Sequence, residues 1–165
     1  MSDKDEIAAR FIAGHRTVEL VKRGAAGESH RLALRVDGRI KGEVELSSTA
    51  IPEIAVDDSY LFVTSPGGSL WALRLEDSEL QRFDFKAPVV GVYRSMERYW
   101  VVCESFVALW DPAEAGVRAR CEHDEVILQC WWTEGRLTVE DLQSRVFDVV
   151  YDETSGGLEL VPSAR

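Results

Sequence analysis

The sequence contains few of the residues that build metal, disulfide or catalytic sites. It has 3 cysteines and 3 histidines among 165 residues, and no two cysteines form a Cys-x-x-Cys pair. An odd number of separated cysteines argues against a disulfide framework, so we expect reduced, mostly buried thiols at Cys103, Cys121 and Cys130. No cofactor or metal is expected from such a composition.

Long apolar runs are absent as well. None approaches the roughly 18 consecutive apolar residues that a transmembrane helix needs. The N-terminal stretch MSDKDEIAARF carries acidic residues where a signal peptide has a basic stretch and an apolar core. We therefore expect a cytoplasmic protein that does not enter a membrane.

Basic residues are outnumbered by acidic ones, 19 to 29, which gives a net charge of -10 spread along the whole chain. An acidic surface repels the phosphate backbone of nucleic acids, so the expected partner is a protein. Apolar residues make up 45% of the sequence and charged residues 29%, which is ordinary for a folded domain. At this length we expect a single domain, spanning residues 1–165, that buries roughly two-thirds of its unfolded surface.

The chain repeats itself with a period of about 39 residues. A shift of 39 places Tyr60 on Tyr99 and Trp71 on Trp110. In three copies two apolar or aromatic landmarks lie ten positions apart, at 61 and 71, at 100 and 110, and at 137 and 147. A weaker copy precedes them, in which ALR at 33–35 matches ALR at 72–74. The sequence thus predicts four repeats, at residues 11–50, 51–87, 88–124 and 125–162.

Each repeat has the pattern of four short β-strands. Most runs are four to eight residues long, rich in Val, Leu and aromatic residues, and bounded by Gly, Pro, Asp or Ser. The second run of each repeat is almost continuously apolar, as in SYLFVTS and RYWVVCE, which predicts a strand covered on both faces. The segment at residues 5–14 has two open interpretations. It is either a short helix with Ile7, Phe11 and Ile12 on one face, or the first strand of the first repeat.

Four-stranded repeats of about 40 residues, with a third strand that ends in an aromatic residue, resemble the blades of a β-propeller. The run VALWDP, with Trp110-Asp111, looks like the Trp-Asp strand of WD40 repeats, and SLWALRLEDSEL is similar to the corresponding strand of quinoprotein-like repeats. The resemblance covers most of residues 17–161, but the Gly-His pair that opens a typical WD40 blade is absent. It implies an all-β fold of about four antiparallel blades.

The resemblance leaves two architectures open. Four blades either close as a four-bladed ring or form an open half-propeller whose end blades pair with another chain. We favour the open array, because the last repeat contains all four of its own strands. A homodimer that completes an eight-bladed ring would then cover the exposed blade faces, and a partner with further blades would serve equally well.

Candidate site residues have plain structural interpretations. Trp71, Trp100 and Trp110 recur at repeat positions and are expected in the core. Of the adjacent Trp131 and Trp132, which point to opposite faces of a strand, we expect Trp132 to be the more exposed. Cys121-Glu122-His123 offers at most two zinc ligands and is read as a solvated strand end. If the protein has a recognition surface, we expect it at the loop tips and at one tryptophan: Pro66, Gly67, Gly68, Ser105, Phe106, Leu142 and Trp132.

Three functions are consistent with these features. The leading hypothesis is a non-enzymatic module for protein interaction or self-assembly, because no catalytic constellation is found. A second is an immunity or antitoxin-like protein whose acidic face neutralises a basic partner. A third is a small-molecule or sugar-binding propeller, or a hydrolase, for which Glu53, Arg94 and Gln129 form an unconvincing set.

Overall fold

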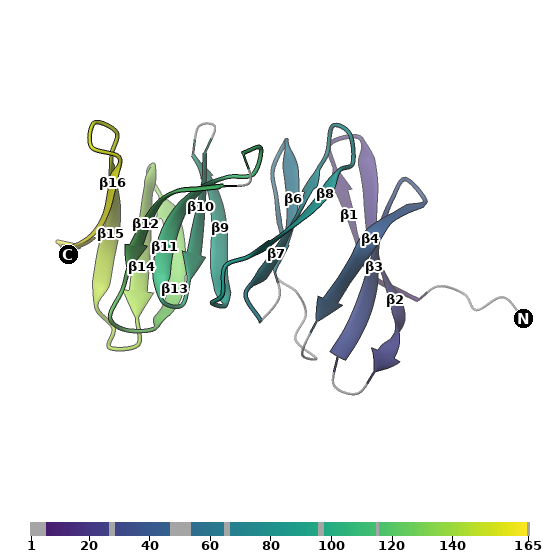
Figure 1. Ribbon diagram of the computed structural model, residues 1–165, viewed down its shortest axis with the longest axis horizontal. Helices are drawn as coiled ribbons and strands as arrows, with labels where there is room; N and C mark the ends of the chain where they lie inside the picture. Colours follow the sequence, from purple (N-terminus) through teal and green to yellow (C-terminus); the bar gives the residue numbers. More distant parts are fainter. Residues whose placement is uncertain are drawn as a thin grey trace, which may run out of the picture. The chain divides into compact units, whose positions relative to one another are not determined.

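The computed structural model describes residues 6–26, 29–46, 54–64, 67–95, 98–114 and 116–164. These residues form sixteen β-strands in four antiparallel sheets, and each sheet consists of four consecutive strands in sequence order (Figure 1). The chain divides into two compact units, Met1–Lys86 and Ala87–Arg165, each with two sheets. The described part of the chain has no helix long and apolar enough to cross a membrane.

The first unit holds the first and second sheets. The first sheet consists of β1 (Ile7–Ala13), β2 (Arg16–Ala26), β3 (Ser29–Val36) and β4 (Arg39–Leu46). The second consists of β5 (Ile54–Val56), β6 (Tyr60–Thr64), β7 (Ser69–Arg74) and β8 (Leu80–Asp84).

The second unit holds the third and fourth sheets. The third sheet consists of β9 (Val89–Ser95), β10 (Arg98–Cys103), β11 (Phe106–Asp111) and β12 (Gly116–Glu122). The fourth consists of β13 (Ile127–Thr133), β14 (Arg136–Asp141), β15 (Val146–Asp152) and β16 (Gly157–Pro162).

The N-terminal segment is a strand, so the helix considered for residues 5–14 is wrong. Ala9, Phe11 and Ala13 alternate along β1 and pack against the core of the first unit. Arg10, which lies between them, points to the other face and donates a hydrogen bond to Glu19 of β2 (2.8 Å). Pairing with β2 thus selects the period of two over the helical period.

Each unit has its own apolar core between two sheets. In the first unit, residues such as Leu20, Leu34 and Trp71 form one buried cluster. In the second unit, Leu109 and Val139 belong to a cluster that joins the third and fourth sheets. The tryptophans expected in the core, Trp71, Trp100 and Trp110, are 4%, 9% and 1% exposed.

The third and fourth sheets approach closely at their first strands, β9 and β13. Gly91 of β9 faces Cys130 of β13, and a Cβ atom at Gly91 would lie only 2.7 Å from Cys130 Sγ. Beside it, the Tyr93 hydroxyl donates a hydrogen bond to the Cys130 carbonyl (2.8 Å). Glycine at this position therefore allows the two strands to come together.

Shortening a buried side chain in the core of the second unit should strongly destabilise the fold. We expect Leu109→Ala, at a fully buried position, to lower the free energy of unfolding by about 2–5 kcal/mol, because methyl groups are lost and a cavity remains. Val117→Ala removes a side chain that is 48% exposed and should change it by less than about 0.5 kcal/mol. Urea denaturation followed by circular dichroism measures both; equal effects would show that the packing of Leu109 is not as described.

Candidate functional site

Two turns that the sequence marks as a recognition surface lie at one edge of the second unit, which we call the loop edge. Glu104 and Ser105 form a two-residue turn between β10 and β11, and residues 141–145 connect β14 to β15. Leu142 is 59% exposed and Ser105 is exposed as well. Both side chains are accessible to a partner, which is what their proposed role requires.

Phe106 is not part of this surface, and its placement at an exposed loop tip is wrong. Because the turn ends at Ser105, Phe106 is already the first residue of β11, and it is only 1% exposed. The guanidinium carbon of Arg120 lies 3.6 Å from the centre of its ring, a cation–π contact that covers it. Phe106 therefore serves the packing of the third sheet.

In the first unit, the corresponding turn between β6 and β7 is described in part. Gly67 is exposed, but Gly68 is buried, so its place on an exposed recognition surface is wrong; its φ of +86° is a left-handed conformation that glycine adopts without strain. Pro66 lies outside the described residues. This turn has the conformation expected of a hairpin connection rather than of a phosphate-binding loop, because a strand follows it.

Trp131 and Trp132 are both half-buried. Trp132 packs against the core cluster of the second unit and stacks on Tyr93, with ring centres 6.4 Å apart. Trp131 is not part of that cluster; it pairs with Thr138 on the opposite face of the fourth sheet. The sequence predicts one inward and one outward tryptophan, but it is Trp132 that faces the core.

A buried polar network at the loop edge was not foreseen. Asp141 has a fully buried side chain, and His123, the residue after β12, has a side chain that is 7% exposed. His123 Nε2 lies 3.0 Å from Asp141 Oδ2, where a protonated nitrogen donates to the carboxylate. Arg145 Nε donates to the same oxygen (2.7 Å), and the backbone N–H groups of Gln143 and Arg145 donate to Oδ1 (both 2.9 Å).

These hydrogen bonds fix the charge of Asp141. Burial by itself would raise the pKa of the carboxyl, but the donors from Arg145, His123 and Gln143 outweigh it and lower the pKa from 3.8 to about 2. The ring of His123 also lies against Phe147 of β15, with ring centres 4.9 Å apart. His123 is thus held from two sides, so the interpretation as a solvated strand end is wrong for His123, whereas Glu122 beside it is exposed.

The network is suited to structure rather than to catalysis. In the described part of the chain, no hydroxyl or thiol is hydrogen-bonded to the His123 ring, so the nucleophile of a catalytic triad is missing there. Its function is to join the end of the third sheet to the β14–β15 turn of the fourth. The only sequence signal for it is an aspartate four residues before an arginine, which is too common to be informative.

Metal and redox chemistry also lack a site among the described residues, where no three His, Cys, Asp or Glu side chains come together. The three cysteines are free, one buried and two half-buried. Burial raises the pKa of the Cys103 thiol to about 12, which makes it a poor nucleophile. Of the set considered for an enzyme, Arg94 and Gln129 are exposed strand residues and Glu53 lies outside the described residues.

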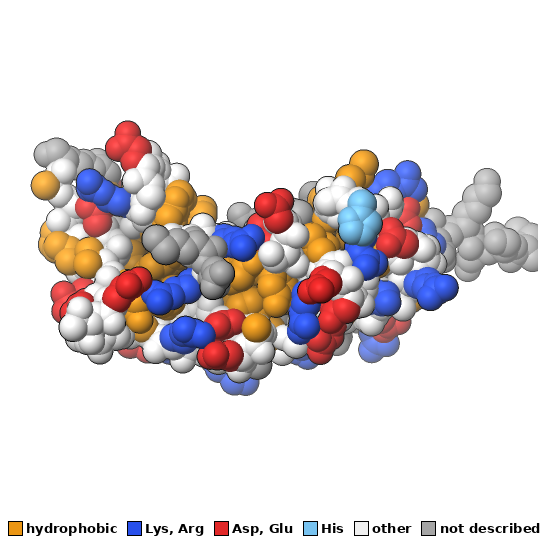
Figure 2. All heavy atoms as spheres, turned by 90° about the horizontal axis from the view of Figure 1, so that it is seen from above, with side chains coloured by type: hydrophobic (Ala, Val, Ile, Leu, Met, Phe, Trp, Pro, Cys, Tyr) orange, Lys and Arg blue, Asp and Glu red, His pale blue; other side chains and the backbone are white. Residues whose placement is uncertain are grey.

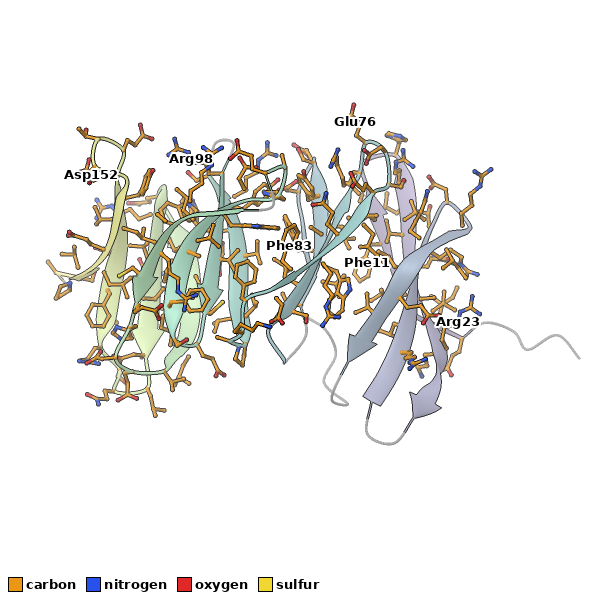
Figure 3. All side chains as sticks on the ribbon, in the orientation of Figure 1. Phe11, Arg23, Glu76, Phe83, Arg98 and Asp152 are labelled. Carbon is orange, nitrogen blue, oxygen red and sulfur yellow. The ribbon has the colours of Figure 1, made fainter. Side chains whose placement is uncertain are left out.

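The second unit contains a cavity of about 450 Å³ between the third and fourth sheets, at the edge opposite the loop edge. Trp100, Trp132 and Tyr151 contribute aromatic walls, and Arg98 and Arg136 contribute positive charge. In Figure 3, Arg98 of the third sheet and Asp152 of the fourth sheet lie at the same edge of the second unit, at the top of the view. A cavity of about 440 Å³ lies at the equivalent place in the first unit, lined by residues that include Arg16, Tyr60 and Arg74.

The outer face of the fourth sheet, opposite the third sheet, is apolar and acidic. Leu160 and Val149 face the core, so their neighbours Val161 and Val150 point outward, and they are 42% and 47% exposed. Trp131 shares this face, and so do the carboxylates of Glu140, Asp148 and Glu159 and one basic residue, Arg136, whose neighbour Leu137 faces the core. In Figure 2, hydrophobic side chains reach the surface beside acidic ones at the left end, where this sheet lies.

The outer face of the first sheet, opposite the second sheet, combines isoleucines with arginines. Ile12 and Ile40 are 78% and 51% exposed. Between them, Glu19 of β2 is flanked by Arg10 of β1 and Arg35 of β3, with nitrogen–oxygen distances of 2.6 and 2.7 Å. Hydrogen bonds from Arg10 and Arg35 lower the pKa of Glu19, so it stays ionised between two cations. This row of one acid and two bases carries a net positive charge.

The low pKa of Asp141 predicts an acid-sensitive element. Because the pKa is lower in the folded protein than in the unfolded chain, the ionised carboxylate stabilises the fold above about pH 4, and this stabilisation is lost as the pH falls toward about 2. We expect Asp141→Asn to lower the melting temperature at neutral pH and to flatten its dependence between these pH values. Thermal unfolding from pH 2 to 7 measures this, with Leu142→Ser in the same turn as the control; a wild-type profile for Asp141→Asn would contradict it.

No protein-family model matches the sequence, and a comparison with curated protein sequences gives no match. Solved structures do match, at 11–14% identity, which is evidence for the fold alone. The WD40 domain of Toxoplasma gondii coronin matches with a TM-score of 0.59, a chain of the mitotic checkpoint complex with 0.61, and BamB from Moraxella catarrhalis with 0.56.

These alignments cover 98%, 96% and 85% of this chain, but only 46%, 54% and 41% of the respective neighbours. The chain therefore spans about half the length of the structures it matches. In every described sheet the four strands follow one another as a simple antiparallel meander, as the sequence repeats predict. The chain is thus an all-β protein built from four propeller-type blades.

Proposed function

We propose that this chain is a non-enzymatic protein-interaction module that assembles through the outer faces of its first and fourth sheets. The observation that carries the proposal is the pair of exposed apolar faces, each at the outside of a two-sheet core. A blade is normally covered on both faces, so exposed valines, isoleucines and a tryptophan at these places indicate a surface meant for contact.

The charges favour a second copy of this chain as the partner. The outer face of the fourth sheet carries three acids, Glu140, Asp148 and Glu159, and one base, Arg136, so it is net negative, whereas the row Arg10–Glu19–Arg35 on the first sheet is positive. A first sheet from one copy is thus complementary in charge to a fourth sheet from another, while two fourth sheets would repel each other. Such a contact joins two different faces, so it is heterologous. A two-copy assembly is then closed only if each copy uses both its first-sheet face and its fourth-sheet face.

Two copies would supply eight blades. The matched structures are about twice as long as this chain, which supports an assembly of that size. Among the described residues no hydroxyl or thiol is hydrogen-bonded to His123 and no metal cluster is found, which supports a binding role over an enzymatic one. As part of this proposal the protein acts in the cytoplasm, as expected from its composition.

The proposal predicts self-association that depends on Val161. We expect the wild-type protein to show a mass of twice 18.5 kDa by light scattering, and Val161→Asp to shift it to the monomer, because a buried unpaired carboxylate opposes the contact. Val117→Asp, on β12 and similarly exposed, is the matched control and should keep the wild-type mass. A wild-type monomer at all concentrations would exclude a second copy and leave a different protein as the partner.

The heterologous geometry can be tested by complementation. Ile12→Asp damages the first sheet's outer face and Val161→Asp damages that of the fourth, so each variant alone should be monomeric. A mixture of the two retains one undamaged contact, between the first sheet of the Val161→Asp chain and the fourth sheet of the Ile12→Asp chain. We expect the mixture to form heterodimers in native mass spectrometry. If it stays monomeric while the wild type dimerises, the contact joins like faces instead.

A further inference from the structure

The cavity of the second unit lies where the two central strands of the fourth sheet separate. Pairing between β14 and β15 is limited to residues 138–140 with 146–148. Beyond the last pair, Arg136 and Leu137 line the cavity from β14, and residues 149–151 line it from β15. None of these residues has a partner across the β14–β15 gap. The backbone edges of both strands are therefore available at the cavity.

The other sheets do not have this opening. In the third sheet the central pairing continues to Tyr99 and Trp110, and in the second sheet to Tyr60 and Arg74. In the second sheet a further bond follows, from the Leu75 N–H to the Ser59 carbonyl (2.9 Å). The early end of the β14–β15 ladder is thus a local property of the fourth sheet rather than a general feature of the repeats.

Two hydrogen-bond donors at the cavity have no acceptor among the described residues. The Nε1–H group of Trp100 is buried and has no hydrogen-bond partner there. Arg136 is exposed and has no carboxylate within ion-pair distance in the described part of the chain. A buried N–H group without an acceptor costs free energy, and an added acceptor recovers it. Both donors therefore favour a ligand that accepts hydrogen bonds, and the cation favours a negative one.

The acidic residues around the cavity already have partners. Glu153 accepts a bond from Arg98 (3.2 Å), and Asp148 accepts one from the Thr138 hydroxyl (3.2 Å). The Tyr151 ring receives the Arg98 guanidinium on its face, 5.3 Å away, and the edge of Trp100, 6.3 Å away. Among the described residues at the cavity, Arg136 is thus the cation without an acidic partner. It lies next to an aromatic wall that suits an apolar group.

The cavity of the first unit is a natural comparison, because its two arginines are paired through their terminal nitrogens, although the Nε–H groups of both lack a partner in the described part of the chain. Arg16 donates to the Glu76 carbonyl (2.7 Å), to the Ser78 hydroxyl (2.8 Å) and to Asp37 (3.2 Å). Arg74 donates to Asp77 and Glu79 (3.1 and 2.6 Å). Both cavities therefore have N–H groups without an acceptor, but among the described arginines that line them only Arg136, in the second, has no carboxylate within ion-pair distance.

We propose that the cavity of the second unit binds a carboxylate carried on an apolar group. The carboxylate accepts hydrogen bonds from Trp100 Nε1–H and Arg136, and the apolar group packs against Trp132 and Tyr151. Two sources supply this chemistry: the C-terminus of a polypeptide that ends in an apolar residue, and a small carboxylic acid. This proposal rests on the cavity's own residues, although Asp148 and Val150 line the cavity and also belong to the face proposed above for assembly.

Nitrogen-15 NMR of the indole N–H signals tests the site directly. The protein has 5 tryptophans, and the signal of Trp100 is assigned by its loss in Trp100→Phe. The probes are 3-phenylpropanoate and acetyl-Gly-Gly-Phe with a free C-terminus, each titrated to about 10 mM, together with their neutral amides. We expect both carboxylates, or one of them, to shift the Trp100 signal with a Kd of roughly millimolar or below. A response to the peptide alone identifies a polypeptide C-terminus, and a response to phenylpropanoate alone identifies a small acid.

Two substitutions separate this site from a general effect of charge. Arg136→Gln should weaken binding about tenfold or more, because a charge-assisted hydrogen bond is lost at an exposed position that folding does not need. Arg74→Gln in the first unit's cavity is the matched control and should leave the affinity unchanged. The proposal is overturned if neither carboxylate shifts the Trp100 signal, if the amides bind as tightly as the acids, or if the two arginine variants weaken binding equally.

Discussion

The structure depends on strands that are apolar on both faces. Leu61, Phe62 and Val63 follow one another in β6 and are all at most 2% exposed, and residues 100–103 of β10 are all buried. Because neighbouring residues of a strand point in opposite directions, such a strand must be covered on both sides. One sheet cannot meet that requirement alone, so each sheet packs against the other sheet of its unit.

The outer faces of the first and fourth sheets differ in their charges. The first sheet places a charged row on its outer face, with Glu19 held between Arg10 and Arg35 so that the three ions satisfy one another. The fourth leaves Val150 and Val161 exposed and Trp131 half-buried, among carboxylates that have no such compensating row. The proposed association between unlike faces rests on this asymmetry.

Most of the fold could be predicted from the sequence, because the signals are local. The period of two, the turn residues and the recurring pair Leu61 and Trp71 identified the strands and the repeats. The N-terminal segment could not be settled in this way: Ile7 and Phe11 fit a helix, whereas Ala9 and Phe11 fit a strand. Pairing with β2 decides between them, and that pairing is a property of the folded chain.

The candidate sites were less predictable because they depend on register and turn length. Phe106 was misplaced since the turn before it has two residues rather than three. The network of His123 and Asp141 joins positions 18 residues apart on different sheets, and no local pattern marks it. The cavity arises where β14 and β15 stop pairing, and no residue type in the sequence predicts where that pairing ends.

The meander order of the strands has a consequence for how such a chain forms and changes. Each strand pairs with the strand before and after it in sequence, so hairpins can form without first closing a long loop. Short sequence separation between partners favours rapid folding for a β protein. Because strands pair only within their own repeat, a gene segment of about 39 codons can be duplicated or lost without changing the strand pairing of any other sheet. Chain length can then change in steps of whole blades.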